Sequence, residues 1–368
     1  MMENNSENHN KNHNKNHSEI ERKKGREMSM EGLVETENGQ FSTIQEALDD
    51  LERHPDTVRR ILVHPGVYED QVTVRVPGVT ICGESREMTE QTVITYALGA
   101  RTILEDGKKR GTFRTYTMFV DAPDVTLENL TIENGAGPGT EVGQAIALYA
   151  DGDRLCVRGC RLLGWQDTLF TAPLPPKEIE KDGFIGPKQF APRMKTRQYY
   201  EDCYIEGEVD FIFGGAMAWF ENCTLFSKNV DREIKGYVTA PSTPEGQRFG
   251  YVMSHCRFES NCPQETVYLG RPWREWAKVV LLNCEIGAHI CAEGWNDWGK
   301  ELAHETSFFA EYGCQGEGAD LSNRPDWTHR LTKAQAEEYT VAKMFDGSEI
   351  AGFKSWNPIK TTETTKNK

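Results

Sequence analysis

Short apolar runs separated by turn residues cover most of the chain. Residues 72–76 read Val-Thr-Val-Arg-Val, Pro77 and Gly78 follow, and residues 79–81 read Val-Thr-Ile. This alternation is typical of brief β-strands joined by tight turns. Because no long helical pattern alternates with these runs, a (β/α) barrel or a doubly wound sheet is disfavoured.

Helices are expected at the two ends of this β-rich region. Ser42 and Gln45 fit a capping box, and apolar residues follow them at helical spacing. Thr332 and Gln335 fit a second box near the other end. We therefore expect one short helix before the strands and one after them.

A short internal repeat indicates how the strands are arranged. Each copy has a polar or small residue, then Cys, then any residue, then a large apolar residue. The copies begin at Gly159, Asp202, Asn222, His255 and Asn283, and an earlier copy with Leu in the Cys place begins at Asn129. A fixed unit at variable spacing is typical of a solenoid with loops of different length.

The cysteines of this repeat are interpreted as core residues. In a strand, residues two apart share a face, so Cys160 and Leu162 would point the same way. Cys is among the most buried residue types and packs as a small hydrophobe. None of these cysteines shows the CxxC spacing of a metal site. The sequence predicts a single parallel β-helix with an inner cysteine stack and short flanking helices.

Composition narrows the environment and the partners. The 368 residues include 42 Lys and Arg against 57 Asp and Glu, a net charge of −15, which argues against a nucleic-acid binder. The first thirty residues lack the apolar core of a signal peptide, and no apolar stretch is long enough for a membrane span. If residue 1 is the natural start, we expect a cytoplasmic protein whose ten cysteines are thiols; otherwise the alternative is a secreted protein.

The two ends of the chain differ from its body. Residues 1–30 and 360–368 are polar and lack hydrophobic periodicity, so we expect a disordered leader and a disordered tail. The folded domain is expected to span residues 31–359.

Two glutamines and an aspartate stand beside apolar runs. Gln144 opens the run 144–148, and Gln166 and Asp167 precede Leu-Phe in the segment 164–170. These amides either complete turns or donate hydrogen bonds to developing negative charge. On adjacent coils of a β-helix the two glutamines would lie close together.

Asp210 stands in the apolar sequence Val-Asp-Phe-Ile-Phe. A carboxylate buried in such a strand is costly unless it is paired, so it needs a cation. Arg271, in Leu-Gly-Arg-Pro-Trp, is a candidate that would keep Asp210 ionised. Trp273 in the same segment would offer a flat face to a sugar ring. The alternative is an Arg-Pro turn beside a core Trp.

Together these residues favour one kind of chemistry. The candidate set holds no histidine, and the chain has neither a Gly-x-Ser-x-Gly elbow nor a Walker phosphate loop. Two carboxylates, one of them kept ionised by Arg, divide the roles of acid and nucleophile. Two amide donors suggest an oxyanion hole. The set predicts ester hydrolysis through an aspartyl intermediate.

These motifs resemble those of the pectin methylesterases (pectinesterases, carbohydrate esterase family 8). The resemblance covers residues 38 to about 327 and includes Gln-Ala-Ile-Ala-Leu at 144–148, Gly-Trp-Gln-Asp-Thr-Leu at 164–169, Val-Asp-Phe-Ile-Phe-Gly at 209–214 and Leu-Gly-Arg-Pro-Trp at 269–273. It implies a right-handed parallel β-helix that needs no metal or organic cofactor. The implied partner is methyl-esterified homogalacturonan or an oligogalacturonide, and we expect a monomer.

The resemblance also implies a role for each candidate residue. Asp210 would be the nucleophile, and Asp167 the general acid and then the base. Gln144 and Gln166 would stabilise the oxyanion, and Arg271 would orient Asp210. The implied substrate-binding residues are Thr112, Phe170, Phe213 and Trp273.

Two departures from the family pattern stand out. Glu208 replaces a smaller residue and adds charge beside Asp210. Residues 171–197 form an insertion beside the expected site, where long loops are usually functional. Our hypothesis is that it narrows the cleft and favours short oligomers. The alternatives are another pectin-active β-helix enzyme, a lyase or polygalacturonase, and a non-catalytic carbohydrate-binding β-helix.

Overall fold

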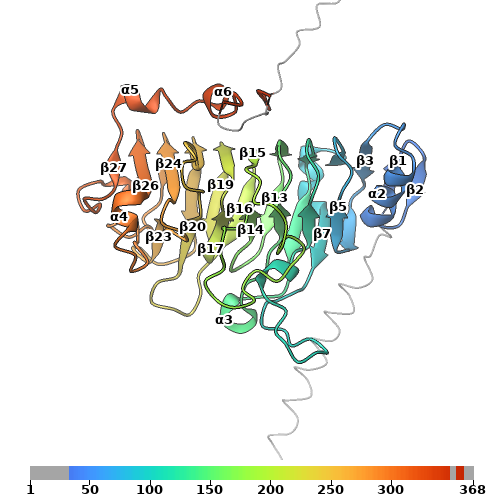
Figure 1. The fold of residues 1–368 in the computed structure, drawn as a ribbon, viewed down its shortest axis with the longest axis horizontal. Coiled ribbons are helices and arrows are strands. Elements are labelled where there is room, and N and C mark those ends of the chain that lie inside the picture. The colour runs from blue at the N-terminus through green and yellow to red at the C-terminus, as the bar shows by residue number, and fades with distance from the viewer. Residues whose placement is uncertain (1–32, 349–353, 360–368) are drawn as a thin grey trace, which may run out of the picture.

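Three parallel sheets wind around one long axis in the computed structural model, which describes residues 33–348 and 354–359 (Figure 1). Each turn of the chain contributes one strand to each sheet, so neighbouring coils pair in register. The predicted parallel β-helix is confirmed. The predicted leader 1–30 and tail 360–368 lie outside the described residues.

Sheet A, in spatial order, contains β2 (Gly39–Phe41), β1 (Val34–Thr36), β3 (Arg60–Val63), β6 (Thr80–Gly83), β9 (Thr126–Glu128), β12 (Leu155–Arg158), β15 (Arg197–Glu201), β18 (Met217–Glu221), β21 (Tyr251–Ser254), β24 (Lys278–Leu282), β26 (Phe308–Tyr312) and β27 (His329–Arg330). Among the described strands, antiparallel pairing is confined to β1 with β2 and β1 with β3.

Sheet B contains β4 (Gly66–Glu69), β7 (Thr92–Tyr96), β10 (Thr131–Asn134), β13 (Arg161–Leu163), β16 (Tyr204–Gly207), β19 (Thr224–Ser227), β22 (Arg257–Ser260) and β25 (Glu285–Ile286). Sheet C contains β5 (Val72–Val74), β8 (Met118–Val120), β11 (Leu148–Ala150), β14 (Leu169–Thr171), β17 (Val209–Gly214), β20 (Gly236–Pro241) and β23 (Val267–Gly270). The outer face of sheet C carries the site described below.

The helices are short and lie outside the coils. They are α2 (Ile44–Arg53), α3 (Gly139–Val142), α4 (Ala303–Thr306), α5 (Lys333–Ala336) and α6 (Val341–Met344), with 3-10 turns η1 (Arg86–Gln91), η2 (Thr112–Arg114) and η3 (Glu317–Ala319). In Figure 1, α2 covers the N-terminal end of the β-helix, while α5 and α6 lie beside its C-terminal half.

The two predicted helix starts have different outcomes. The capping box of α2 uses Thr43 and Glu46, one residue later than predicted, because the adjacent pair of hydroxyl residues allows either frame. The box at Thr332 and Gln335 is confirmed. The helix it opens is shorter than expected, since a second cap at Thr340 starts α6 separately.

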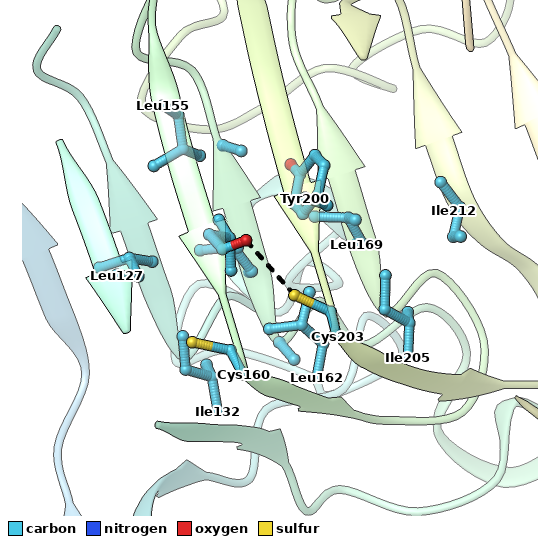
Figure 2. Packing of buried hydrophobic residues seen from close by; sticks show 14 of the residues in the cluster. Leu127, Ile132, Leu155, Cys160, Leu162, Leu169, Tyr200, Cys203, Ile205 and Ile212 are labelled. Carbon is cyan, nitrogen blue, oxygen red and sulfur yellow. Dashed lines mark hydrogen bonds between the residues drawn. The ribbon is translucent and has the colours of Figure 1, made fainter. Parts of the chain in front are cut away.

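The repeated cysteines line the interior at one corner of successive coils. Cys160, Cys203, Cys223, Cys256 and Cys284 are buried and free. Figure 2 shows Cys160 and Cys203 among core leucines and isoleucines, with the Cys203 thiol donating to the Val157 carbonyl at 3.5 Å. The predicted inner stack is confirmed.

The repeat is a corner rather than the continuous strand that we predicted. The residue before each core position has positive φ, between 51° and 59°, at Asn129, Gly159, Asp202, Asn222, His255 and Asn283. Asn, Asp and Gly tolerate this left-handed conformation best. The polar or small residue of the repeat therefore turns the chain from sheet A into sheet B.

Candidate active site

A cavity of about 470 Å³ lies over the outer face of sheet C. Its walls come from the loops that precede or follow successive strands of this sheet. The lining residues are Thr112, Phe113, Gln144, Gln166, Asp167, Ile179, Glu180, Gly183, Phe184, Asp210, Phe213, Ala240, Arg271, Trp273, Arg274, Trp298 and Lys300. The β-helix thus brings all five predicted catalytic residues to one cavity.

Asp210 reaches this cavity through an irregularity in β17. Its φ is 52°, and the pairing of β17 with β20 shifts register between Val209 and Ile212. Arg271 holds the carboxylate with two parallel hydrogen bonds, from Nε to Oδ1 at 2.8 Å and from Nη2 to Oδ2 at 2.7 Å. Burial raises the pKa of Asp210 above its usual value, and the Arg271 charge and hydrogen bonds oppose this rise. The predicted pair is present.

Asp167 lies near this pair, and no cation among the described residues donates a hydrogen bond to its carboxyl, although the Arg271 charge acts on it. It also has positive φ, 67°, and its backbone N–H donates to the Val209 carbonyl at 3.1 Å. Burial, and then the nearby Asp210 charge, raise the pKa of Asp167 well above its usual range, against the opposing charge of Arg271. The two carboxyls therefore differ: Asp210 is held by an arginine, while Asp167 favours its proton.

Gln144 and Gln166 lie on adjacent coils, one position apart in register. The backbone N–H of Ala145 donates to the Gln166 carbonyl at 3.0 Å, which fixes the two segments side by side. Both side chains line the cavity next to Asp167. Their amides can therefore donate to an oxyanion formed in front of the carboxyl pair.

The predicted substrate-binding residues divide into two groups. Thr112, Phe213 and Trp273 line the cavity. Phe170 does not; it is fully buried, with its ring 4.9 Å from that of Phe213. Alternation along β14 turns Phe170 to the outer face, but neighbouring aromatic rings cover it there. It supports the cavity floor from below and does not line the cavity itself.

Trp298 and Lys300 also line the cavity, although neither was among the predicted site residues. The Arg271 guanidinium lies between the rings of Tyr237, at 3.8 Å, and Trp298, at 3.6 Å. Lys300 Nζ lies 4.3 Å from the same Trp298 ring and donates to the Trp273 carbonyl at 3.0 Å. Burial, and then the Arg274 charge, lower the pKa of Lys300 to about 8. The only signal in the sequence was a Trp in a polar, Gly-containing segment.

The predicted insertion forms one wall of the cavity. Residues 172–196 join β14 to β15 without a helix or strand. Phe184 packs against Phe113 and Trp273, with ring centroids 5.7 and 6.3 Å apart. Lys188 pairs with Asp121 and with Asp151, the latter at 3.0 Å, and so ties the loop to the strand ends of sheet C.

The described residues contain neither a metal-ligand cluster nor a membrane-spanning helix. Within 33–348 and 354–359, no group of three or more His, Cys, Asp or Glu side chains is arranged to hold a metal ion. No helix in the described part of the chain has the length and apolarity to cross a membrane.

A parallel β-helix with an arginine-paired aspartate, a second buried aspartate and two amides in one cavity defines an aspartyl carboxylic ester hydrolase. The pectinesterase family model matches residues 33–174 and 192–348, and the chain belongs to this family. It is a pectin methylesterase, which de-esterifies homogalacturonan. The unmatched residues 175–191 fall within the predicted insertion.

Relatives and solved structures agree with this membership. Pectinesterase 31 of Arabidopsis thaliana is 33% identical over 316 residues, covering 84% of this chain and 90% of that protein. The pectin methylesterase PemA from Erwinia chrysanthemi has a TM-score of 0.66 and 29% identity, covering 86% of this chain and 95% of its own. The carrot enzyme has a TM-score of 0.69 and 26% identity, covering 86% and 91%.

Several relatives are longer than this chain. The chain covers 52% of pectinesterase/pectinesterase inhibitor 18 of Arabidopsis thaliana, at 29% identity and across 84% of its own length. Membership of this family disfavours the three alternative functions: a lyase, a polygalacturonase and a non-catalytic carbohydrate-binding β-helix.

Proposed function

We propose that Asp210 attacks the methyl ester carbonyl at C6 of a galacturonate unit. An oxygen–carbon bond forms, and the carbonyl electron pair moves to an oxyanion that the Gln144 and Gln166 amides stabilise. The observation that carries this proposal is the double hydrogen bond from Arg271 to Asp210, beside a second carboxyl that favours its proton.

Asp167 serves both halves of the reaction. When the tetrahedral intermediate collapses, the methoxy oxygen takes the Asp167 proton and leaves as methanol, and galacturonate stays bound to Asp210 as an acyl-enzyme. Asp167 then removes a proton from water, which attacks the acyl carbon. The products are a free galacturonate carboxylate and the regenerated Asp210.

Methanol release from pectin tests these roles. Asp210→Asn keeps the size and left-handed conformation of the residue and removes the nucleophile, so turnover should fall to background while the melting temperature shows an intact fold. Asp210→Asn with wild-type turnover would refute the nucleophile assignment.

Trp273→Ala should raise KM more than it lowers kcat if the ring holds sugar.

We further propose that a monomer acts on short methylated oligogalacturonides more efficiently than on polymer. The wall formed by Ile179, Glu180 and Phe184 supports this, because it bounds the cavity on one side. A related pectin methylesterase, 28% identical, has been crystallised with a hexasaccharide, which supports an oligosaccharide as ligand. The test compares the rate of methanol release per methyl ester on pectin and on methylated trigalacturonate. Equal rates would refute the preference for short oligomers.

A further inference from the structure

Glu208 is a buried carboxylate that the proposed reaction does not use. Its side chain is fully buried immediately before β17, two residues from Asp210. Its Oε1 accepts a hydrogen bond from the Gly139 N–H at 2.5 Å. Its Oε2 accepts none among the described residues, and Arg232 Nη1 lies 4.0 Å away. Burying an incompletely paired carboxylate costs free energy, so a functional reason for Glu208 is expected.

The contacts of Gly139 connect Glu208 to the oxyanion side of the cavity. A Cβ at Gly139 would lie 2.4 Å from Gln166 Oε1 and 2.8 Å from Glu208 Oε1. Because glycine has no Cβ, the side chains of Gln166 and Glu208 can both pack against the backbone of Gly139. By holding the Gly139 N–H, Glu208 fixes the surface against which the Gln166 amide rests.

The charge of Glu208 also affects Asp167. Burial and the Asp210 charge raise the pKa of Asp167 most, and Glu208 raises it further, while Arg271 lowers it. Lys300 acts on Asp210 from the opposite wall and lowers the pKa of Asp210. Glu208 is thus the second negative neighbour of Asp167.

We propose that Glu208 is a positioning residue for the esterase: by holding the Gly139 N–H it supports the Gly139–Gln166 contact on the oxyanion side of the cavity, and its buried carboxylate, two residues before Asp210, sets the charge around Asp167. The inference rests on the roles proposed above for Asp167 and Gln166. It also accounts for a charged residue where the family pattern has a smaller one.

The test compares Glu208→Gln, Glu208→Ala and Glu259→Gln with the wild type. Gln keeps the acceptor oxygen and the volume but removes the charge, whereas Ala removes both. Glu259, exposed on β22 of sheet B, controls for the change in net charge. Methanol release from methylated trigalacturonate gives kcat and KM between about pH 5 and pH 10, and melting curves report folding.

For Glu208→Gln, the alkaline limb of kcat should move down by about one pH unit with little change in KM, because Asp167 loses its proton at lower pH. For Glu208→Ala, kcat should also fall about tenfold across the pH range, as Gln166 loses its support. Glu259→Gln should match the wild type.

A Glu208→Gln profile that superimposes on the wild type, or that Glu259→Gln reproduces, would overturn the proposal. A lower melting temperature with an unchanged profile would assign Glu208 a purely structural role and overturn it too. A folded wild type that releases no methanol would instead refute the proposed function. The Gln variant keeps the test decisive if the Ala variant fails to fold.

Discussion

Replacing Arg271 with Ala should move the pH dependence of the enzyme, and not only reduce its rate. Arg271 makes both hydrogen bonds to the Asp210 carboxylate, and both side chains are largely buried. Its charge also lowers the pKa of Asp167. Without it, the nucleophile ionises at higher pH, and the acid keeps its proton to higher pH. Both limbs of the bell-shaped profile should therefore move upwards.

The size of the shift follows from the geometry. For charge centres about 4 Å apart and an effective dielectric constant of about 20, the interaction is about 4 kcal/mol, or about three pKa units. Water that enters the space left by the guanidinium reduces this value. We expect the acidic limb of kcat/KM to rise by about one to three pH units, so that the loss is greatest at low pH and shrinks as pH rises.

Methanol release over a broad pH range measures this shift, with Arg271→Lys as the matched variant. Lys keeps the positive charge but cannot make the double hydrogen bond, so its limbs should stay close to those of the wild type while kcat falls. The reasoning is refuted if Arg271→Ala loses the same factor at every pH. That result would mean that Arg271 orients Asp210 without controlling its ionisation.

Three further outcomes are expected. Asp167→Asn should have a higher melting temperature than the wild type at pH 8 and the same melting temperature near pH 4. The pKa of Asp167 is raised in the folded state, so the fold has its full stability below the unfolded pKa of about 3.9. The wild type loses this stability as the pH rises through the folded pKa, whereas the uncharged Asn does not. A thiol reagent should label Cys262 and Cys314 first, because the other eight cysteines are buried; equal labelling of all ten in native protein would contradict the inner stack. Lys188→Ala should speed tryptic cleavage within 175–191, while Lys181→Ala should not. Because burial raises the pKa of Asp151 to about 6, the wild-type loop should also be cleaved faster at pH 5 than at pH 7.5 once each rate is divided by that of an unstructured peptide with the same sequence; equal normalised rates would argue against the ion pair between Lys188 and Asp151.

The fold was predictable because its signal is local and repeated. The unit of Cys, any residue and a large apolar residue recurs on five successive coils, and each copy marks an inward-facing position. What the pattern did not reveal was the left-handed residue before each copy. A short polar residue there is compatible with a strand or with a corner, and only the pairing of neighbouring coils decides between them.

The cavity was predictable where its residues lie on strand ends and not where they lie on loops. Asp167 and Asp210 stand at matching positions of adjacent coils along sheet C, and Gln144 precedes the strand on the coil before them. Trp298 and Phe184 come from connections whose paths depend on tertiary packing, so spacing along the chain says nothing of their contact with Arg271 or Trp273. Phe170 was assigned to the cavity surface because alternation predicts the face of a sheet but not what covers that face.

Backbone conformation adds a constraint on the catalytic aspartates that their chemistry alone does not. Asp167 and Asp210 both have positive φ, as do the corner residues of the coils. Asp and Asn tolerate this conformation better than longer side chains do. An Asp-to-Glu exchange would therefore strain the backbone and also move the carboxyl by a methylene, whereas Asp-to-Asn changes only the charge. Two requirements therefore restrict the residue type at these positions: the reaction needs a carboxylate, and the left-handed backbone conformation favours a short side chain.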